Sequence, residues 1–343
     1  MPDTCRRIVL ARRPQGAPVP DDFRLEEAPT PEPREGEALV RTVWLSLDPY
    51  MRGRMSDAPS YAPSVDVGAV MTGEGVGEVV ASRSPALRPG DIVRGFGGWQ
   101  SHFALPADKL TKVDPDLAPI STALGVLGMP GMTAYAGLLA IGEPKPGETV
   151  VVGAATGAVG AVAGQIAKIK GCRAIGVAGG REKCDYAVRE LGFDACIDRR
   201  EPELGHRLKE LCPDGVDVYV ELTGGAITDT VLPLLNTFAR IPVIGLVAHY
   251  NATALPEGQD RMPWLLRQTL SKRLRIQGMI VWDYAALEPD FRRDVAAWLR
   301  AGRIRYREDV TEGLENAPAA LIGMLEGRNF GKQLVRVGPD PAR

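Results

Sequence analysis

The sequence is poor in the residues that build metal sites. Its 343 residues include only three histidines, His102, His206 and His249, and none of them lies at metal-ligand spacing from any of the five cysteines. The cysteines form no CxxC pair, which structural zinc sites commonly use. We therefore expect no metal site, although carboxylates could in principle assemble one. An odd, scattered set of cysteines also favours a reduced, cytoplasmic chain over a disulfide framework.

The chain also lacks a charge surplus and a long apolar run near its start. Lysine and arginine number 41 and aspartate and glutamate 43, which gives a formal net charge of −2. Without a basic surplus, nucleic acid is not an expected partner. The apolar stretch at 8–11 is too short for a signal peptide or a membrane span, so we expect a cytoplasmic protein with no membrane partner. The ordinary composition and the length indicate about two globular domains.

The N-terminal and C-terminal parts of the chain differ in their expected secondary structure. The first ~125 residues combine short β-rich segments with proline and glycine, which is typical of a compact β-rich unit. From Thr149 onward, buried strands alternate with helices, which predicts a doubly wound α/β fold with a parallel sheet. A last strand, 332–337, is expected to return to the N-terminal unit. The predicted strands are 37–47, 75–82, 91–95, 103–106, 149–152, 173–177, 196–198, 216–222, 239–246 and 275–281, and the helices are 158–170, 182–191, 203–212, 226–236, 262–270 and 289–301.

A glycine-containing turn joins the first strand of the α/β region to its first helix. Gly157 allows the backbone to approach a bound pyrophosphate, and Gly160 allows the helix to pack close to the strand. The start of the helix would offer free N–H groups to the phosphates. Ala155 replaces the first glycine of the usual fingerprint. The prediction of a dinucleotide site therefore rests on the position of the turn, which follows a strand and opens a helix. The alternative is a helix that only packs tightly on its sheet. The residues assigned to the cofactor in this turn are Ala155, Thr156, Gly157, Ala158, Val159 and Gly160.

The end of the second strand indicates which dinucleotide would bind. NAD sites usually carry an acidic residue about 20 residues beyond the glycines. Here that position is Gly180, with Gly179 before it and Arg181 and Lys183 after it. Room and positive charge suit a 2′-phosphate, which predicts NADP(H). The alternative is that Lys183 is only a solvated residue of the next helix, although a lysine there opposes the helix dipole.

Six segments together carry a family resemblance over nearly the whole chain. The chain resembles the zinc-free medium-chain dehydrogenases/reductases, and within them the leukotriene B4 12-hydroxydehydrogenase and prostaglandin reductase group with its bacterial alkenal and curcumin reductase relatives. The segments are LSLDPYMR at 45–52, GMPGMTAY at 128–135, AATGAVG at 154–160, LGFD at 191–194, GLVAHYN at 245–251 and NFGK at 329–332.

The resemblance implies an architecture and an assembly. It implies a Rossmann-type sheet that binds NADP(H) and a β-rich GroES-like catalytic domain. The corresponding divisions are a catalytic domain at 1–127, a nucleotide-binding domain at 128–305 and a returning segment at 306–343. It also implies a homodimer formed through the nucleotide-binding sheet, with the strand at 275–281 as the edge involved.

The resemblance further assigns residues near the cofactor. Met129 and Thr133 would line the nicotinamide site, and Lys183 matches the family lysine after the second strand. Arg199 stands where the family usually has a tyrosine that contacts the adenosine phosphate. The remaining matches are Thr223 before the glycine pair of the fourth strand, Gly245, the pair Tyr250 and Asn251, and Asn329 near the C-terminus.

These assignments point to reduction of a C=C bond conjugated to a carbonyl. Such a reduction needs hydride at the β-carbon, stabilisation of the enolate oxygen and a proton for the α-carbon. Alcohol oxidation normally needs zinc or a tuned base, so the missing zinc ligands favour C=C reduction. Tyr50 and Tyr250 are the candidate catalytic donors, although each could equally be structural or shape the pocket. A quinone reductase and a non-enzymatic NADPH-binding protein remain alternatives.

Overall fold

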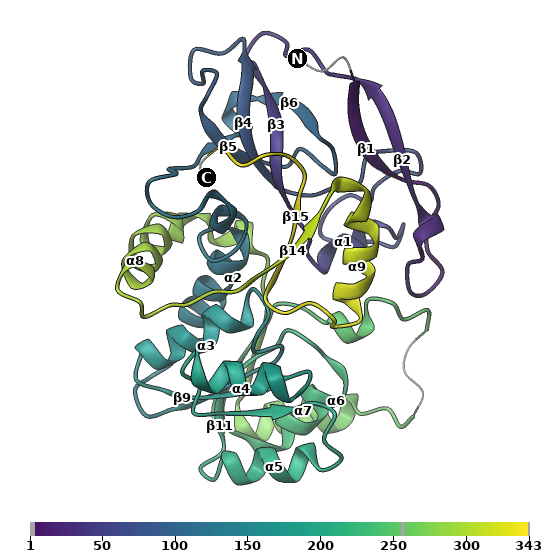
Figure 1. Ribbon diagram of the computed structural model, residues 1–343. Helices are drawn as coiled ribbons and strands as arrows, with labels where there is room; N and C mark the ends of the chain where they lie inside the picture. Colours follow the sequence, from purple (N-terminus) through teal and green to yellow (C-terminus); the bar gives the residue numbers. More distant parts are fainter. Residues whose placement is uncertain (1–3, 255–257, 342–343) are drawn as a thin grey trace. The chain divides into compact units, whose positions relative to one another are not determined.

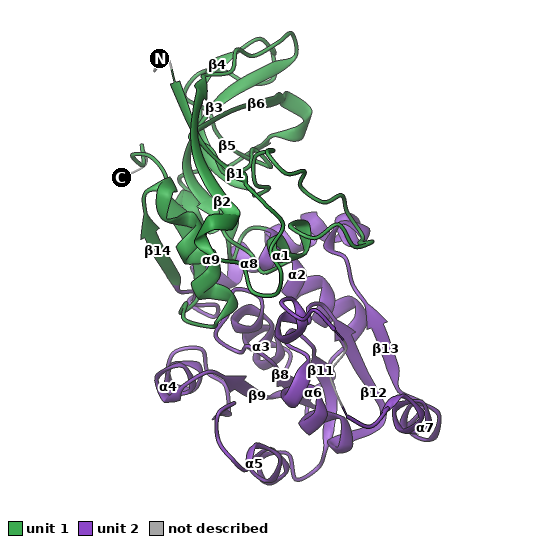
Figure 2. Ribbon diagram, turned by 90° about the vertical axis from the view of Figure 1, so that its right-hand side faces the viewer, with its two compact units in different colours: residues 1–128, 308–343 green, residues 129–307 purple. Residues whose placement is uncertain are grey.

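The computed structural model describes residues 4–254 and 258–341, and the chain divides into two compact units (Figures 1 and 2). Unit 1 comprises residues 1–128 and 308–343, and unit 2 comprises residues 129–307. The tail belongs to unit 1, where strand β15 (Lys332–Arg336) pairs antiparallel with β3 (Glu37–Ser46).

Unit 1 is built around a mixed seven-stranded sheet. The four strands predicted for this part of the chain all form, with shifts of one residue at their ends. Beside this sheet lies a separate antiparallel pair, β1 (Thr4–Leu10) and β2 (Phe23–Pro29). The sheet has the order β14 (Glu308–Glu312), β15, β3, β4 (Gly75–Ser82), β5 (Ile92–Gly95) and β7 (Thr111–Lys112), with β6 (His102–Pro106) paired to β3.

One apolar cluster in unit 1 holds the segment that carries Tyr50. The short helix α1 (Tyr50–Arg54) contributes Met51 to this cluster, where it packs with Trp99 and with Leu321 of α9 (Ala317–Leu325). All three side chains are fully buried. The start of α1 is therefore anchored to the interior of unit 1 by packing.

Unit 2 is a parallel doubly wound sheet, as predicted. Its strand order is β10-β9-β8-β11-β12-β13, in which the first strand in sequence, β8, lies between β9 and β11. The order reverses at this point, which is where open α/β sheets bind ligands. The strands are β8 (Thr149–Val152), β9 (Arg173–Ala178), β10 (Ala195–Asp198), β11 (Val216–Val220), β12 (Leu235–Val243) and β13 (Arg275–Gly278). The helices are α2 (Met129–Ala136), α3 (Gly160–Ile169), α4 (Arg181–Arg189), α5 (Leu204–Leu211), α6 (Gly225–Val231), α7 (Met262–Lys272) and α8 (Glu288–Arg300).

Several predicted boundaries in unit 2 are wrong. The helix predicted at 226–236 ends as α6 at Val231, and a 3₁₀ turn containing Pro233 leads into β12. Strand β12 therefore begins at Leu235, four residues earlier than predicted. Phe238 interrupts its register in a left-handed conformation with φ of 66°. The strand predicted at 275–281 ends at Gly278, because a 3₁₀ segment begins at Val281.

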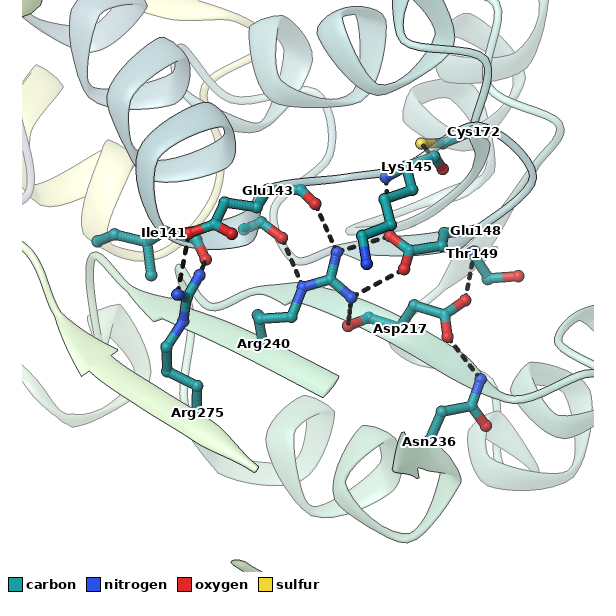
Figure 3. A network of polar contacts seen from close by, with 11 residues as sticks. Ile141, Glu143, Lys145, Glu148, Thr149, Cys172, Asp217, Asn236, Arg240 and Arg275 are labelled. Carbon is teal, nitrogen blue, oxygen red and sulfur yellow. Dashed lines mark hydrogen bonds and ion pairs between the residues drawn. The ribbon is translucent and has the colours of Figure 1, made fainter. Parts of the chain in front are cut away.

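An arginine network fixes the end of the sheet opposite the candidate site (Figure 3). The Arg240 guanidinium donates to the carbonyl of Gly142 at 2.7 Å and forms an ion pair with Glu148 at 2.6 Å. Arg275, on the neighbouring strand, pairs with Glu143 at 2.9 Å. Charge-assisted hydrogen bonds thus tie β12 and β13 to the segment that precedes β8.

Candidate functional site

The candidate site in unit 2 lies where parallel strands end. Segments 153–160, 179–183 and 221–225 follow β8, β9 and β11, and segment 244–251 follows β12. Because the strands are parallel, their carboxyl ends share one edge of the sheet, which is the edge where ligands bind in such folds. The fold thus brings most of the predicted cofactor residues of unit 2 to this edge.

The turn after β8 is shaped by backbone contacts that exclude side chains. A β-carbon on Gly160 would lie 2.3 Å from the carbonyl oxygen of Ala154, so glycine is required there. A β-carbon on Gly157 would lie 3.2 Å from the same carbonyl oxygen. Ala154 itself adopts a left-handed conformation with φ of 46°. Helix α3 consequently begins at Gly160, two residues later than predicted, and residues 155–159 form an open turn before it.

Two arginines lie over the glycines that follow β9. A β-carbon on Gly179 would come within 3.2 Å of Arg199 Nε, and one on Gly180 within 3.6 Å of Arg200 Nη1. Asp198 holds this arrangement, because its Oδ1 accepts the backbone N–H of Gly180 at 2.9 Å and of Arg200 at 3.1 Å. Burial opposes ionisation of Asp198, but these two hydrogen bonds outweigh it and lower its pKa. Arg200 was not singled out from the sequence, although it directly follows Arg199 after the third strand.

Lys183 lies on the first turn of α4, close in sequence to this pair of glycines. Its side chain is half-buried, whereas Glu182 is exposed. The strand end therefore combines bare glycine backbone with three basic side chains, Lys183, Arg199 and Arg200. An arginine fork suits a phosphate monoester because it can donate two hydrogen bonds at once.

The turn after β11 is organised by a buried carboxylate that sequence reasoning missed. Glu221 is 2% exposed, and its Oε1 accepts the N–H of Thr223 at 2.7 Å and of Gly224 at 2.9 Å. The hydroxyl of Thr228 donates to Oε2. Four donors would be needed to saturate such a buried carboxylate, and the turn supplies most of them. This places Thr223, itself buried, in a fixed position at the edge of the sheet.

The segment after β12 carries Gly245, Tyr250 and Asn251. The backbone N–H of Leu246 approaches Tyr250 Oη at 3.4 Å, and a β-carbon on Gly245 would lie 3.4 Å from the same oxygen. Tyr250 and Asn251 are both half-buried. The tyrosine hydroxyl thus lies back over the start of its own loop.

Met129 and Thr133 lie one turn apart on α2. The Thr133 hydroxyl donates to the carbonyl of Met129 at 2.7 Å, and the threonine is 7% exposed. Both residues belong to unit 2, like the residues at the sheet edge.

Tyr50 and Asn329 belong to unit 1. Tyr50 Oη is buried and has no hydrogen-bond partner within the described ranges. Burial, together with the negative charges of Asp48 and Glu74, raises the pKa of Tyr50 well above its ordinary value. The hydroxyl is therefore kept protonated. The Asn329 amide donates to the carbonyl of Gly331 at 2.9 Å.

Buried ion pairs surround the segment that precedes Tyr50. Lys332 Nζ donates to Asp48 Oδ1 and to the carbonyl of Leu47, both at 2.7 Å. Arg94 pairs with the buried Glu74, also at 2.7 Å. The sequence motifs contained Asp48 and Lys332, but nothing in either motif indicates that the two residues meet.

Comparisons with known proteins extend these observations. Residues 6–113 match a family described as the N-terminal domain of oxidoreductase, and residues 158–300 match one described as zinc-binding dehydrogenase. The chain is 55% identical to the NADPH-dependent curcumin reductase of Escherichia coli over 336 residues, which cover 98% of this chain and 97% of the relative. The chain belongs to the medium-chain dehydrogenase/reductase family.

Other members of this family are similar over comparable lengths. The 2-alkenal reductase (NADP(+)-dependent) of Nicotiana tabacum is 40% identical, with 97% of each chain covered. The crystal structure of CurA from Vibrio vulnificus in complex with NADPH is 51% identical and has a TM-score of 0.94, with 97% of this chain and 99% of that chain covered.

The family description mentions zinc, but the residues present do not fit a zinc site. Within residues 4–254 and 258–341, no three histidine, cysteine, aspartate or glutamate side chains come together as metal ligands. Tetrahedral zinc needs at least three such protein ligands. The same ranges contain no helix long and apolar enough to cross a membrane.

Proposed function

We propose that the protein reduces the C=C bond of α,β-unsaturated ketones and aldehydes with NADPH. The observation that carries the proposal is the 55% identity, over 98% of the chain, to an enzyme named NADPH-dependent curcumin reductase. The similarity to a 2-alkenal reductase and to a structure that contains NADPH supports the same chemistry. The quinone oxidoreductase structures are 22% identical and share only the fold, so nothing specific favours the quinone alternative.

The residues of unit 2 fit NADPH. The open turn at 155–159 and Gly160 would hold the pyrophosphate at the start of α3. Lys183, Arg199 and Arg200 would bind the 2′-phosphate above Gly179. Thr223, Gly245, Asn251, Met129 and Thr133 would contact the nicotinamide half, and the resemblance adds Asn329 to the cofactor residues. When bound, NADPH supplies the hydride that the reaction consumes.

The protein's own contribution is to stabilise charge on the substrate oxygen and to control a proton. Hydride addition at the β-carbon places negative charge on the carbonyl oxygen, where a hydroxyl donor lowers the barrier. Tyr50 meets this requirement, because its raised pKa keeps the proton and no partner within the described chain occupies its hydroxyl. Tyr250 is the second candidate donor. Substituting either tyrosine with phenylalanine should separate the two, since losing such a donor costs roughly a hundredfold in kcat.

We also propose a cytoplasmic homodimer formed through β13. This strand is at the edge of its sheet, so its outer N–H and C=O groups are available to a second copy. Apolar side chains around the edge are exposed in the single chain, as an interface requires. They are Met262, Leu266, Leu270, Ile276 and Trp282. Light scattering should give twice the mass of the chain, and Ile276→Lys should give the monomer.

One assay separates the proposed function from its alternatives. The rate of NADPH oxidation is measured with a simple enone, with a quinone and with no acceptor. Turnover with the enone alone supports the proposal. Turnover with only the quinone would favour the quinone reductase, and binding of NADPH without any turnover would indicate a non-enzymatic protein.

A further inference from the structure

His249 connects two loops of the candidate site. Its Nε2 accepts the backbone N–H of Gly225 at 3.1 Å. The ring lies directly on Gly224, where an added β-carbon would be 2.7 Å from His249 Cδ2. A second bond joins the same loops, because the N–H of Ala248 donates to the carbonyl of Thr223 at 2.8 Å. The segment after β12 is thus held against the turn after β11.

This contact fixes the hydrogen-bonding role of the two ring nitrogens. A backbone N–H can donate only to a nitrogen with a free lone pair, so Nε2 carries no hydrogen and the proton of the neutral ring is on Nδ1. The N-cap residue of the helix that begins at Gly225 is Gly224, so no N-cap side chain forms a hydrogen bond there. Protonation of His249 would place a hydrogen on Nε2, and two donors would then face each other.

The charged groups near the ring are already engaged. Glu221, at the end of β11, is occupied by the N–H groups of Thr223 and Gly224. Asp229, the only acidic residue of α6, pairs with Arg261 at 2.6 Å. The segment 244–251 contains no aspartate, glutamate, lysine or arginine, and its titratable groups are His249 and Tyr250. Among the described residues of these elements, no carboxylate forms an ion pair with His249.

We propose that neutral His249 is a positioning residue of the reductase, which clamps the loop carrying Tyr250 and Asn251 to the Thr223–Gly225 turn. The proposal rests on the proposed function, because it acts through residues assigned there to the nicotinamide half of NADPH. The residue has no direct role in the reaction. Its effect is to keep the two loops in one arrangement, so that NADPH binds a preformed site.

The test compares two substitutions of the same residue. His249→Gln keeps an oxygen that can accept the Gly225 N–H, whereas His249→Leu keeps the bulk without any acceptor. Losing one such bond corresponds to about a five- to tenfold change. We expect His249→Leu to weaken NADPH binding, measured by nucleotide fluorescence, by about that factor. We expect His249→Gln to stay within about twofold of the unmodified protein. His206→Gln, on the exposed face of α5, is the matched control and should leave NADPH binding unchanged.

Rescue by the conservative variant distinguishes a clamp from a merely structural contact. Only the variant that keeps an acceptor for the Gly225 N–H should keep the affinity of the unmodified protein. Equal affinity of His249→Leu and the unmodified protein would overturn the proposal. A loss of NADPH affinity in His249→Gln as large as that expected for His249→Leu would also overturn it, and this outcome decides the matter if His249→Leu does not fold. Because NADPH binding is the readout, a protein that binds NADPH but reduces no enone would contradict the proposed function without affecting this test.

Discussion

Lys332 and Asp48 form a buried ion pair of 2.7 Å although they are 284 residues apart in the sequence. Lys332 comes from the returning tail and Asp48 from the segment that leads into α1. The pair joins the C-terminal strand β15 to the residues immediately before Tyr50. Both side chains are more than nine-tenths buried, so each ion depends on the other to offset the cost of leaving water.

Removal of one partner should therefore be costly. We expect Lys332→Met to lower the free energy of unfolding by about 3–5 kcal/mol, because it leaves Asp48 buried without its counter-ion. Urea denaturation measures this. Lys112→Met is the control, since the Lys112 side chain is 58% exposed in its pair with Asp91 and should cost less than about 1 kcal/mol. Equal losses in the two variants would contradict the account.

Cofactor preference should depend on the basic residues beside Gly179. We expect Lys183→Ala to raise the KM for NADPH roughly ten- to a hundredfold and to leave the kinetics with NADH nearly unchanged. Arg199→Ala should act in the same direction, because its guanidinium lies against Gly179. Arg189→Ala, on the exposed last turn of α4, serves as the control. Equal use of NADH and NADPH by the unmodified protein would refute the assignment.

The Arg240 network should make the protein sensitive to acid. Burial acts to raise the pKa of Glu148, but hydrogen bonds from Arg240 and from the backbone of Lys145 outweigh it, so the pKa is lowered from 4.5. A carboxyl group with a lowered pKa in the folded state stabilises the protein above its unfolded pKa, and this contribution is lost as the pH falls through the folded value. Between about pH 5 and 3, the unmodified protein should lose more stability than Glu148→Gln, as measured by thermal unfolding. Parallel losses would show that Glu148 does not contribute.

Two cysteines should react slowly with alkylating agents. Burial raises the pKa of Cys172 and of Cys212 to about 11 in each case. The thiolate is the reactive form, so little of it exists at pH 8. Mass spectrometry after brief treatment with iodoacetamide should find both residues unmodified in the folded protein and modified after unfolding in urea. Rapid labelling of either thiol in the folded state would contradict their burial.

The sequence predicted those parts of the fold that depend on local pattern. The alternation from β8 to β10 could be predicted because buried strands and amphipathic helices differ in period, and glycines mark their ends. The pairing of β1 and β2 was missed because the apolar run of β1, Ile8–Leu10, is only three residues long and because β2 is mostly exposed or half-buried. The start of β12 was misplaced because the apolar composition of Leu232–Leu235 is compatible with either a buried helix or a buried strand.

The site was predictable only where a motif names its residues. Glycines and basic residues near strand ends carry a known physical role, so the turn after β8 and Lys183 could be proposed as cofactor-binding residues. Glu221 and His249 act through hydrogen bonds to backbone groups of neighbouring turns, which no local pattern encodes. Arg200 has its place because the strand order brings β10 beside β9, and that order is a property of the folded sheet.

The position of the transferred hydride tests the central claim most directly. The protein is incubated with a simple enone and NADPH that carries deuterium at the transferred position, and the product is analysed by NMR and mass spectrometry. The account predicts a saturated ketone with one deuterium on the carbon β to the carbonyl, because only that attack places charge on the oxygen that a hydroxyl donor stabilises. An allylic alcohol with deuterium on the former carbonyl carbon would contradict it and would make the protein a carbonyl reductase.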